Sequence, residues 1–480
     1  MPANKIKKVI LATAPRAGGE IEMAGLPFLG VGYLASYLEK NGYEVKIVDT
    51  HKENLNESEM AEKIMSFEPE AVGVSANTHN RFRAIEAIKL LKKKNPNLLV
   101  VVGGPHFSLT DKDALAVVPE IDVVVRSEGE VAFEELLSTW PDRERLKNIL
   151  GITYRDENGR IVANANRPFL MDWSELPFPS WHLYNLSEYR KQIHGTDFRT
   201  IGVISARGCP NHCTFCASPD NSVMRLRSAK NFVDELEFLN KKYGFEGFNF
   251  WDDTLTVIKS RVMEICQEII DRKLDIKWYA RARVNTVDKE MIDMMKKAGC
   301  IRISFGVESG SPRVLAVVKK NIDLSQVDFA TRICSEAGLV VSLNFMVNLP
   351  TETMEDLRMT ADLIKKLKKI PRTEVGYGFS LIYPGTEMEV FAKENGILPK
   401  NFSWNSPFQT KKYKMIGADP GIPYMEWPGK ELEVVKSFMV KNLMDRGEIF
   451  NKTWRKLKKI KSWSELISLV KAGAVYLRSK

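Results

Sequence analysis

The sequence predicts an α/β protein with an N-terminal parallel sheet, a partial barrel of βα units and a mainly helical C-terminal region. Two observations support this fold class. Short apolar runs alternate with helical stretches in two separate parts of the chain, which is typical of parallel strands joined by helices. Between about residues 146 and 200 the alternation stops. A chain of 480 residues, 44% hydrophobic and 27% charged, is also long enough for several globular domains.

The first alternation predicts a sheet with helices on both faces. Strand-like runs occupy residues 8–13, 44–49, 71–75, 98–102 and 121–126. Helical stretches lie at residues 29–40, 57–67 and 81–94 and begin again near residue 131. Ligands of such sheets bind beyond the carboxyl ends of the strands. The loops at residues 75–80, 103–108 and 127–130 are therefore the candidate ligand loops.

The middle of the chain predicts a linker followed by an open barrel. Residues 152–162 resemble a hairpin, and Leu176-Pro177-Phe178-Pro179 follows without helical or strand periodicity. Strand-like runs then return at residues 201–206, 247–251, 276–281, 301–307, 340–347 and 375–381. About six βα units suffice for an open barrel but not for an eight-fold one. We expect domains at residues 1–145 and 196–386, a linker at 146–195 and a C-terminal region at 387–480.

The positive charge is concentrated in the C-terminal tail. The chain carries a net charge of +9, and residues 430–480 hold 13 Lys and Arg against 5 Asp and Glu, a net +8. The tail is either a solvated helical face or a contact with an anionic surface. Trp454, Leu457, Ile460, Trp463 and Ile467 recur at helical spacing, which suits packing on the barrel as a lid or an interfacial helix at a lipid surface.

Several features indicate a cytoplasmic protein. No apolar run approaches the roughly 18–20 residues of a membrane span. The apolar stretch after the first lysines stops at Pro15, so it predicts a strand rather than a signal peptide. Six cysteines do not make a disulfide scaffold in a chain of this length. Cys266, Cys300 and Cys334 lie alone in apolar segments and are expected in the core.

The other three cysteines form the strongest motif. Cys209, Cys213 and Cys216 lie directly after a predicted strand with spacing Cys-x3-Cys-x2-Cys. Ligation by thiolates suits zinc or an iron–sulfur cluster. Structural zinc needs a fourth ligand, and His212 is the only nearby candidate. A cluster held by three cysteines leaves one iron open for chemistry. We therefore favour a [4Fe–4S] cluster.

The motif, with Phe215 before its last cysteine, resembles that of the radical S-adenosylmethionine superfamily. In that family the open iron binds S-adenosylmethionine, and reduction gives a 5′-deoxyadenosyl radical. The resemblance implies that Asp252 and Asp253, after the second barrel strand, bind the methionine amino group. It also places Glu308, Ser309 and Asn344, at the ends of the fourth and fifth strands, at S-adenosylmethionine. The match covers about residues 201–386.

The N-terminal sheet resembles the cobalamin-binding domain of one large subfamily. The resemblance implies cobalamin contacts by Ser75, Asn77, Thr78, Gly103, Gly104, His106, Glu128 and Gly129. Two other motifs are discounted. Gly30-Val31-Gly32-Tyr33-Leu34-Ala35 matches a dinucleotide fingerprint, with Asp49 in the position of the ribose-binding acid. The run lies inside a helical pattern, well beyond the first strand, whereas the fingerprint belongs in the turn directly after that strand. Asp49-x-His51 resembles a cobalt-ligating motif but follows the second strand, so we expect cobalamin without His51 as a ligand.

Three functional hypotheses remain, of which the resemblance implies the first two. The leading one is methylation of an unactivated carbon or phosphorus centre through a 5′-deoxyadenosyl radical and methylcobalamin. The second is oxidative cyclisation or carbon–carbon coupling on a tetrapyrrole or a lipid. The third is a cobalamin- or redox-sensing module that binds nucleic acid. We favour an enzyme with a small-molecule or lipid substrate and an external electron donor of the flavodoxin or ferredoxin type, and we expect no nucleic acid partner.

Overall fold

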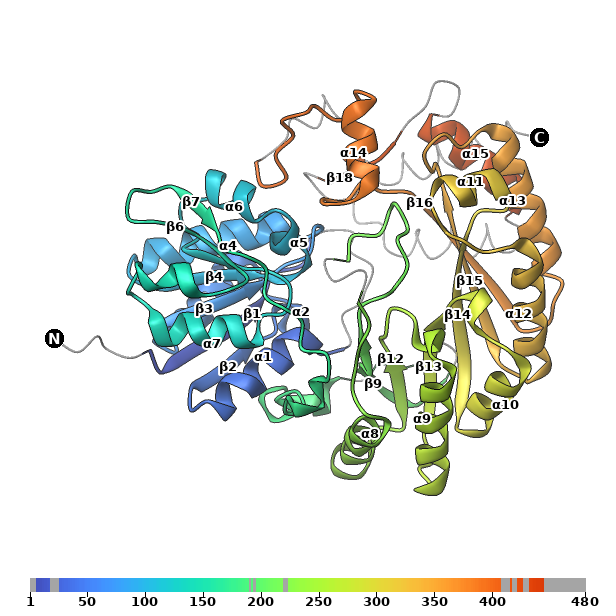
Figure 1. The fold of residues 1–480 in the computed structure, drawn as a ribbon, viewed down its shortest axis with the longest axis horizontal. Coiled ribbons are helices and arrows are strands. Elements are labelled where there is room, and N and C mark those ends of the chain that lie inside the picture. Colours follow the sequence, from blue (N-terminus) through green and yellow to red (C-terminus); the bar gives the residue numbers. More distant parts are fainter. Residues whose placement is uncertain are drawn as a thin grey trace, which may run out of the picture.

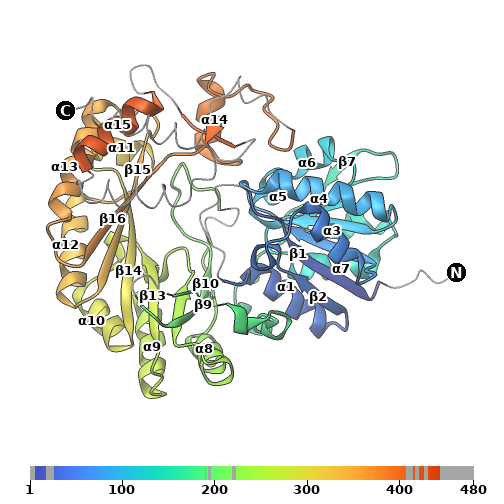
Figure 2. The same ribbon diagram turned by 180° about the vertical axis from the view of Figure 1, so that it is seen from behind.

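The computed structural model describes residues 6–17, 26–189, 191–192, 196–218, 223–406, 415–416, 421–425 and 431–443. It contains two large sheets that lie side by side, each with its own helices (Figure 1). The view from behind shows the same arrangement, with the segment around α14 near the top between the two (Figure 2). The predicted α/β fold with two sheets is confirmed.

The first sheet has the strand order β2-β1-β3-β4-β5-β6-β7. Its strands are β1 (Lys8–Thr13), β2 (Glu44–Val48), β3 (Ala71–Ser75), β4 (Leu99–Gly103), β5 (Val123–Val125), β6 (Ile152–Arg155) and β7 (Ile161–Ala163). The first five are parallel, so their carboxyl ends share one edge. The hairpin β6–β7, which we expected in the linker, adds two antiparallel strands to this sheet.

Helices cover both faces of this sheet because its central strands are apolar on both sides. They are α1 (Leu29–Lys40), α2 (Thr50–Glu53), α3 (Glu57–Met65), α4 (Arg81–Lys94), α5 (Gly104–Leu109), α6 (Asp111–Val117) and α7 (Glu130–Thr139), with the 3-10 turn η1 (Arg145–Asn148). One core lies under α3, α4, α5 and α6, and a second lies under α1 and α7.

The segment between the sheets is held by aromatic side chains. It contains the 3-10 turns η2 (Trp173–Glu175), η3 (Trp181–Leu183) and η4 (Leu186–Glu188). Trp173 and Trp181 are almost fully buried, and the indole of Trp181 donates to Glu235 of the second domain at 3.0 Å. Tyr184 donates to the Phe28 carbonyl at 2.9 Å. The segment thus packs on both sheets.

The second sheet has the order β16-β15-β14-β13-β12-β9-β8, with β8 antiparallel at one edge. Its strands are β8 (Lys191–Gln192), β9 (Arg199–Val203), β12 (Gly247–Phe250), β13 (Lys277–Ala282), β14 (Cys300–Glu308), β15 (Val340–Val347) and β16 (Thr373–Phe379). The last six are parallel, as six βα units predict. A short ribbon, β10 (Ala206–Arg207) and β11 (Arg225–Leu226), follows β9.

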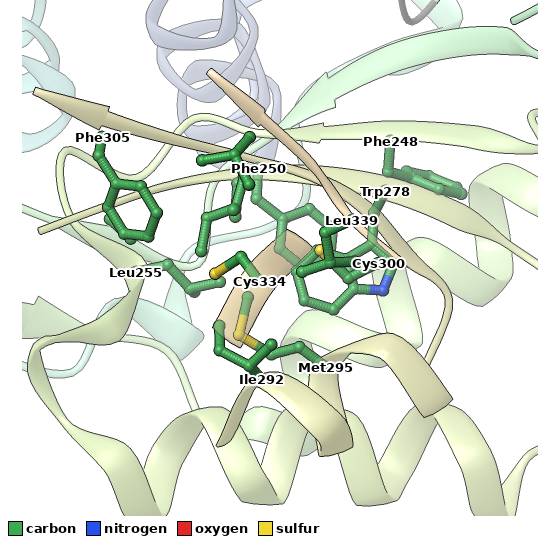
Figure 3. Packing of buried hydrophobic residues seen from close by; sticks show 14 of the residues in the cluster. Phe248, Phe250, Leu255, Trp278, Ile292, Met295, Cys300, Phe305, Cys334 and Leu339 are labelled. Atoms are coloured by element: carbon green, nitrogen blue, oxygen red, sulfur yellow. The ribbon is translucent and has the colours of Figure 1, made fainter. Parts of the chain in front are cut away.

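Helices cover the outer face of the second sheet and leave its inner face toward the first (Figure 1). They are α8 (Ala229–Tyr243), α9 (Lys259–Asp271), α10 (Lys289–Lys297), α11 (Pro312–Val317), α12 (Leu324–Glu336) and α13 (Met354–Leu367), with the turns η5 (Leu255–Val257) and η6 (Val284–Thr286). In the core between this sheet and its helices, Phe250 stacks on Trp278, beside Cys300 and Cys334 (Figure 3). The prediction that Cys266, Cys300 and Cys334 are core residues is confirmed.

The C-terminal region contains α14 (Glu387–Glu394), α15 (Leu432–Leu443) and the short strands β17 (Met415–Ile416) and β18 (Ile422–Pro423). The amphipathic positions from Trp454 onward lie outside the described residues, so the two hypotheses for the basic tail stay predictions. Among the helices that the structure describes, none combines the length and apolar character needed to cross a membrane.

Candidate functional site

A cavity of about 410 Å³ lies between the carboxyl edge of the first sheet and the residues that follow strands β9 and β12 of the second sheet. One wall consists of the ends of β1, β3, β4 and β5 with the first turns of α1 and α7. The opposite wall contains Arg207, Gly208, Trp251 and Asp253, next to the cysteine motif. The two predicted cofactor regions therefore meet at one cavity.

Five of the eight predicted cobalamin residues line this cavity. They are Ser75, Gly103, Gly104, Glu128 and Gly129. Asp253, predicted at S-adenosylmethionine, lines the opposite wall. Because parallel strands end at the same edge, loops distant in sequence converge there.

Glycines give the cavity its shape. A Cβ on Gly30 would meet no atom of the described part of the chain within 4 Å, so the α1 backbone is open to the cavity. A Cβ on Gly73 would lie 2.8 Å from the Leu11 side chain and 3.0 Å from Phe133. Gly104 has φ +84°, which favours glycine, and a Cβ there would meet the Ser75 hydroxyl at 2.6 Å. This cradle of bare backbone and apolar side chains fits a large, mostly neutral ring such as a corrin.

Thr78 and His106 lie in a buried network that does not line the cavity. The His106 ring contacts the Thr78 hydroxyl and the Asn405 side-chain oxygen, each at 3.2 Å. Burial, together with the nearby charge of Arg81, lowers the pKa of His106 to about 3, so the ring is neutral. Arg81 donates to the Trp404 carbonyl at 2.9 Å. The network therefore joins the first sheet to the C-terminal region.

Asn77 and His51 also make local contacts. The Asn77 side chain accepts from the backbone of His79 at 2.8 Å and of Asn80 at 3.1 Å, so it shapes the loop before α4. The His51 ring contacts the Ala14 carbonyl at 2.9 Å and does not line the cavity. Both side chains support the loops around the carboxyl edge of the sheet.

The cysteine loop follows β9 and β10 directly. Cys209 and Cys213 are half-buried and Cys216 is exposed. The Asn211 amide donates to the Cys209 sulfur at 3.3 Å, and Arg283 donates to the Cys213 sulfur at 3.8 Å. Donors at sulfur stabilise thiolates, which are the ligands of an iron–sulfur cluster. In the parts of the chain that the structure describes, no three His, Cys, Asp or Glu side chains are grouped to hold a single metal ion.

The loop is fixed at its centre. Thr214 donates its N–H to the Val318 carbonyl at 3.1 Å and accepts from the Met388 N–H at 3.0 Å. Phe215 packs between two apolar clusters, one around Val314 and one in the C-terminal region. Helix α11 and helix α14 thus hold the loop, and Phe215 serves as its apolar anchor.

Asp252 is a buried carboxylate below the loop. It is 1% exposed and accepts the backbone N–H of Ser205 at 2.9 Å and that of Ala206. Its other oxygen, Oδ2, has no hydrogen-bond partner among the residues that the structure describes. Burial raises the pKa of Asp252 to about 6, although the backbone donors and Arg261 lower it. An orphaned carboxylate oxygen here suits a cationic ligand group.

The predicted residues on the fourth and fifth barrel strands differ in exposure. Glu308 is buried with φ +69° and pairs with Lys320 at 2.7 Å. Ser309 is fully buried against Thr360, at 3.2 Å between hydroxyls. Asn344 is exposed on the inner face and donates to Ser304 at 2.8 Å. Contact of these residues with S-adenosylmethionine stays a prediction.

Sequence reasoning missed four cationic residues of the site. Arg207 and Arg225 pair with Glu128, Arg283 reaches Cys213, and Lys320 pairs with Glu308. Arg207 had one available signal, because it stands two residues before Cys209. The pairings themselves span 77 to 97 positions for Arg207 and Arg225, which no local pattern reports.

Comparisons with known proteins agree with this geometry. Residues 25–137 match the B12 binding domain, and residues 203–364 match the Radical SAM superfamily. An uncharacterized methyltransferase of Pyrococcus horikoshii is 35% identical over 82% of this chain and 85% of its own length. The anaerobic magnesium-protoporphyrin IX monomethyl ester cyclase of Rubrivivax gelatinosus is 32% identical over 71% of this chain and 62% of the cyclase.

A solved structure shows the same fold. The cobalamin-dependent S-adenosylmethionine radical enzyme OxsB, with aqua-cobalamin bound, has a TM-score of 0.74 and 19% identity over 97% of this chain and 71% of its own. The matching domains and relatives identify an enzyme, as the first two hypotheses expected. The chain belongs to the cobalamin-dependent radical S-adenosylmethionine family, which uses a [4Fe–4S] cluster, S-adenosylmethionine and cobalamin.

Proposed function

We propose that this enzyme methylates an unactivated carbon or phosphorus centre of a small molecule. The observation that supports this most is the shared cavity, whose two walls are the glycine cradle of the first sheet and the stem of the cysteine loop. When bound, the cluster and S-adenosylmethionine supply a 5′-deoxyadenosyl radical and cobalamin supplies a methyl group. A substrate at this junction would be reached from both sides.

The inner face of the barrel favours a polar substrate. Arg302 pairs with Glu374 between the amino-terminal parts of β14 and β16. Nearer the carboxyl ends, Arg281 lies over the Trp251 ring at 5.2 Å, and Trp251 lines the shared cavity. The guanidinium group of an arginine such as Arg281 recognises carboxylate and phosphate groups. This chain's residues would bind and orient such a substrate, while an external one-electron donor reduces the cluster.

A second candidate is oxidative cyclisation of a tetrapyrrole. The observation behind it is the 32% identity to an anaerobic magnesium-protoporphyrin ester cyclase. The two functions differ in the fate of the methyl group of S-adenosylmethionine, because a cyclase has no need to transfer it to the substrate.

The experiment uses anaerobically reconstituted enzyme, reductant and S-adenosylmethionine labelled with deuterium in its methyl group. The probes are small phosphonates, carboxylates and magnesium-protoporphyrin monomethyl ester. We expect a product with the labelled methyl, formed together with S-adenosylhomocysteine and 5′-deoxyadenosine. A Cys209→Ala variant is the control, since it should retain cobalamin and form no 5′-deoxyadenosine. Consumption of the porphyrin with 5′-deoxyadenosine but without labelled product would contradict methylation and support the cyclase.

A further inference from the structure

Two arginines of the barrel domain reach into the first sheet at the shared cavity. Arg207 and Arg225 face each other across the ribbon β10–β11. Arg207 Nη2 lies 2.7 Å from Glu130 Oε1, and its Nη1 lies 3.3 Å from Glu128 Oε1. Arg225 Nε lies 2.9 Å from the same Glu128 oxygen. Two guanidinium groups of the barrel domain thus form ion pairs with the loop that follows β5 in the first sheet.

This contact is shielded from water. The side chains of Arg207 and Glu128 are each 14% exposed, that of Glu130 is 8% exposed and that of Arg225 is fully buried. The Arg207 guanidinium also lies over the rings of Tyr33 at 5.1 Å and Trp173 at 4.6 Å. Ion pairs interact strongly in such surroundings, and the planar guanidinium restricts the direction of approach. The contact should therefore hold the two loops in one geometry.

The same contact belongs to both cofactor regions. Glu128, Gly129 and Glu130 line the cavity, and so does Arg207. Arg207 is also joined to Cys209 by the single residue Gly208, whose φ is +83°. A displacement of the Arg207 backbone would move the stem of the cysteine loop, and a displacement of Glu128 would move the cavity wall.

We infer that Arg207 is a positioning residue that sets the placement of bound cobalamin relative to the cluster and S-adenosylmethionine. The inference rests on the proposed function, since it requires both cofactors to act at one cavity. Arg207 acts through Glu128 and Glu130 and transfers no group itself. A misplacement of about 1 Å between reacting groups can cost on the order of 100-fold in rate.

The test compares the reduced holoenzyme with Arg207→Gln, Arg207→Lys and Glu130→Gln variants. The first readout is the electron paramagnetic resonance spectrum of the reduced cluster with cobalamin in its Co(II) form, because the magnetic interaction between the two spins depends on their separation. The second is single-turnover formation of S-adenosylhomocysteine without substrate, after reduction of cobalamin to its Co(I) form, which accepts the methyl group of S-adenosylmethionine. The matched control is Arg272→Gln, because Arg272 pairs with Asp234, Glu237 and Glu268 outside the cavity.

We expect Arg207→Gln to change the spin interaction and to slow the single turnover on the order of 100-fold. Arg207→Lys, which keeps the charge without the planar fork, should be intermediate, and the control should match the wild type. Glu130→Gln probes the contact from the other domain if Arg207→Gln fails to fold. A spin interaction equal to that of the wild type in Arg207→Gln, or in Glu130→Gln where Arg207→Gln does not fold, would overturn the inference. The spectrum involves no substrate methylation, so a failure of methyl transfer alone would instead contradict the proposed function.

Discussion

Replacing Asp252 with asparagine should remove a pH-dependent stability term from the barrel domain. Asp252 is buried, and burial raises its pKa from an ordinary 3.8 to about 6. Between these two values the unfolded chain has already lost the proton while the folded chain still holds it. The free energy of unfolding therefore falls as the pH rises through this range. Well above pH 6 the ionised Asp252 lowers the free energy of unfolding by its full amount.

The size of the effect follows from the two pKa values. Each pKa unit corresponds to about 1.4 kcal/mol, so the penalty of ionised Asp252 reaches about 3 kcal/mol at pH 8. When the titrations of the folded and unfolded states are both included, Asp252 lowers the free energy of unfolding by about 1.6 kcal/mol at pH 5. The loss of stability therefore differs by about 1.4 kcal/mol between pH 5 and pH 8. The asparagine carbonyl can still accept from Ser205 and Ala206. Any constant cost of the new amide is the same at both pH values.

The assay is urea unfolding of the cluster-free proteins, followed by tryptophan fluorescence at pH 5 and pH 8. The stability of Asp252→Asn relative to wild type should rise by about 1.4 kcal/mol from pH 5 to pH 8, because all other titrating groups cancel in the comparison. Asp253→Asn is the control, since this neighbouring carboxyl is exposed. A relative stability that is the same at both pH values would refute the reasoning.

Two steric predictions follow from the glycines. Gly73→Val should reduce cobalamin uptake, because a Cβ at Gly73 would already lie 2.8 Å from the Leu11 side chain at the cavity. Absorbance measures the uptake, and the iron content should be unchanged. Cobalamin uptake equal to that of the wild type would contradict the location of the site. Gly310→Ala should destabilise the protein by about 1–3 kcal/mol in thermal unfolding, since its Cβ would lie 2.6 Å from the Thr360 Cα, a backbone atom. Gly378→Ala is the matched control, because a Cβ there would meet no described residue within 4 Å. Equal unfolding temperatures of the two variants would argue against this packing.

The fold was predictable because its signals are local. Each parallel strand is a short apolar run with a helix after it, and the observed bounds differ from the expected ones by a few residues. The hairpin β6–β7 was recognised, but its sheet was not. Antiparallel pairing of β5 with β6 is a contact between segments about 30 residues apart, which strand propensity alone does not report.

The candidate site was predictable in part for the same reason. Glycine-rich loops at strand ends pointed to the cavity, and Gly103 and Gly129 lie there. His106 follows the same strand end as Gly103 but does not line the cavity. The short helix α5 begins at Gly104 and turns the His106 ring into the core, where Asn405 meets it. A residue that follows a strand end can therefore face the core, and the Asn405 that contacts His106 lies 299 positions later in the sequence.

The Arg81 network has a consequence for how the chain folds. The bond from Arg81 to the Trp404 carbonyl closes a loop of 323 positions. Closing a flexible loop of that length would cost about 5 kcal/mol of chain entropy. This bond can therefore persist only after the sheet and the barrel have formed and brought its ends together. We therefore expect this bond to form late, and we expect the contact between the C-terminal region and the first sheet to depend on a folded barrel.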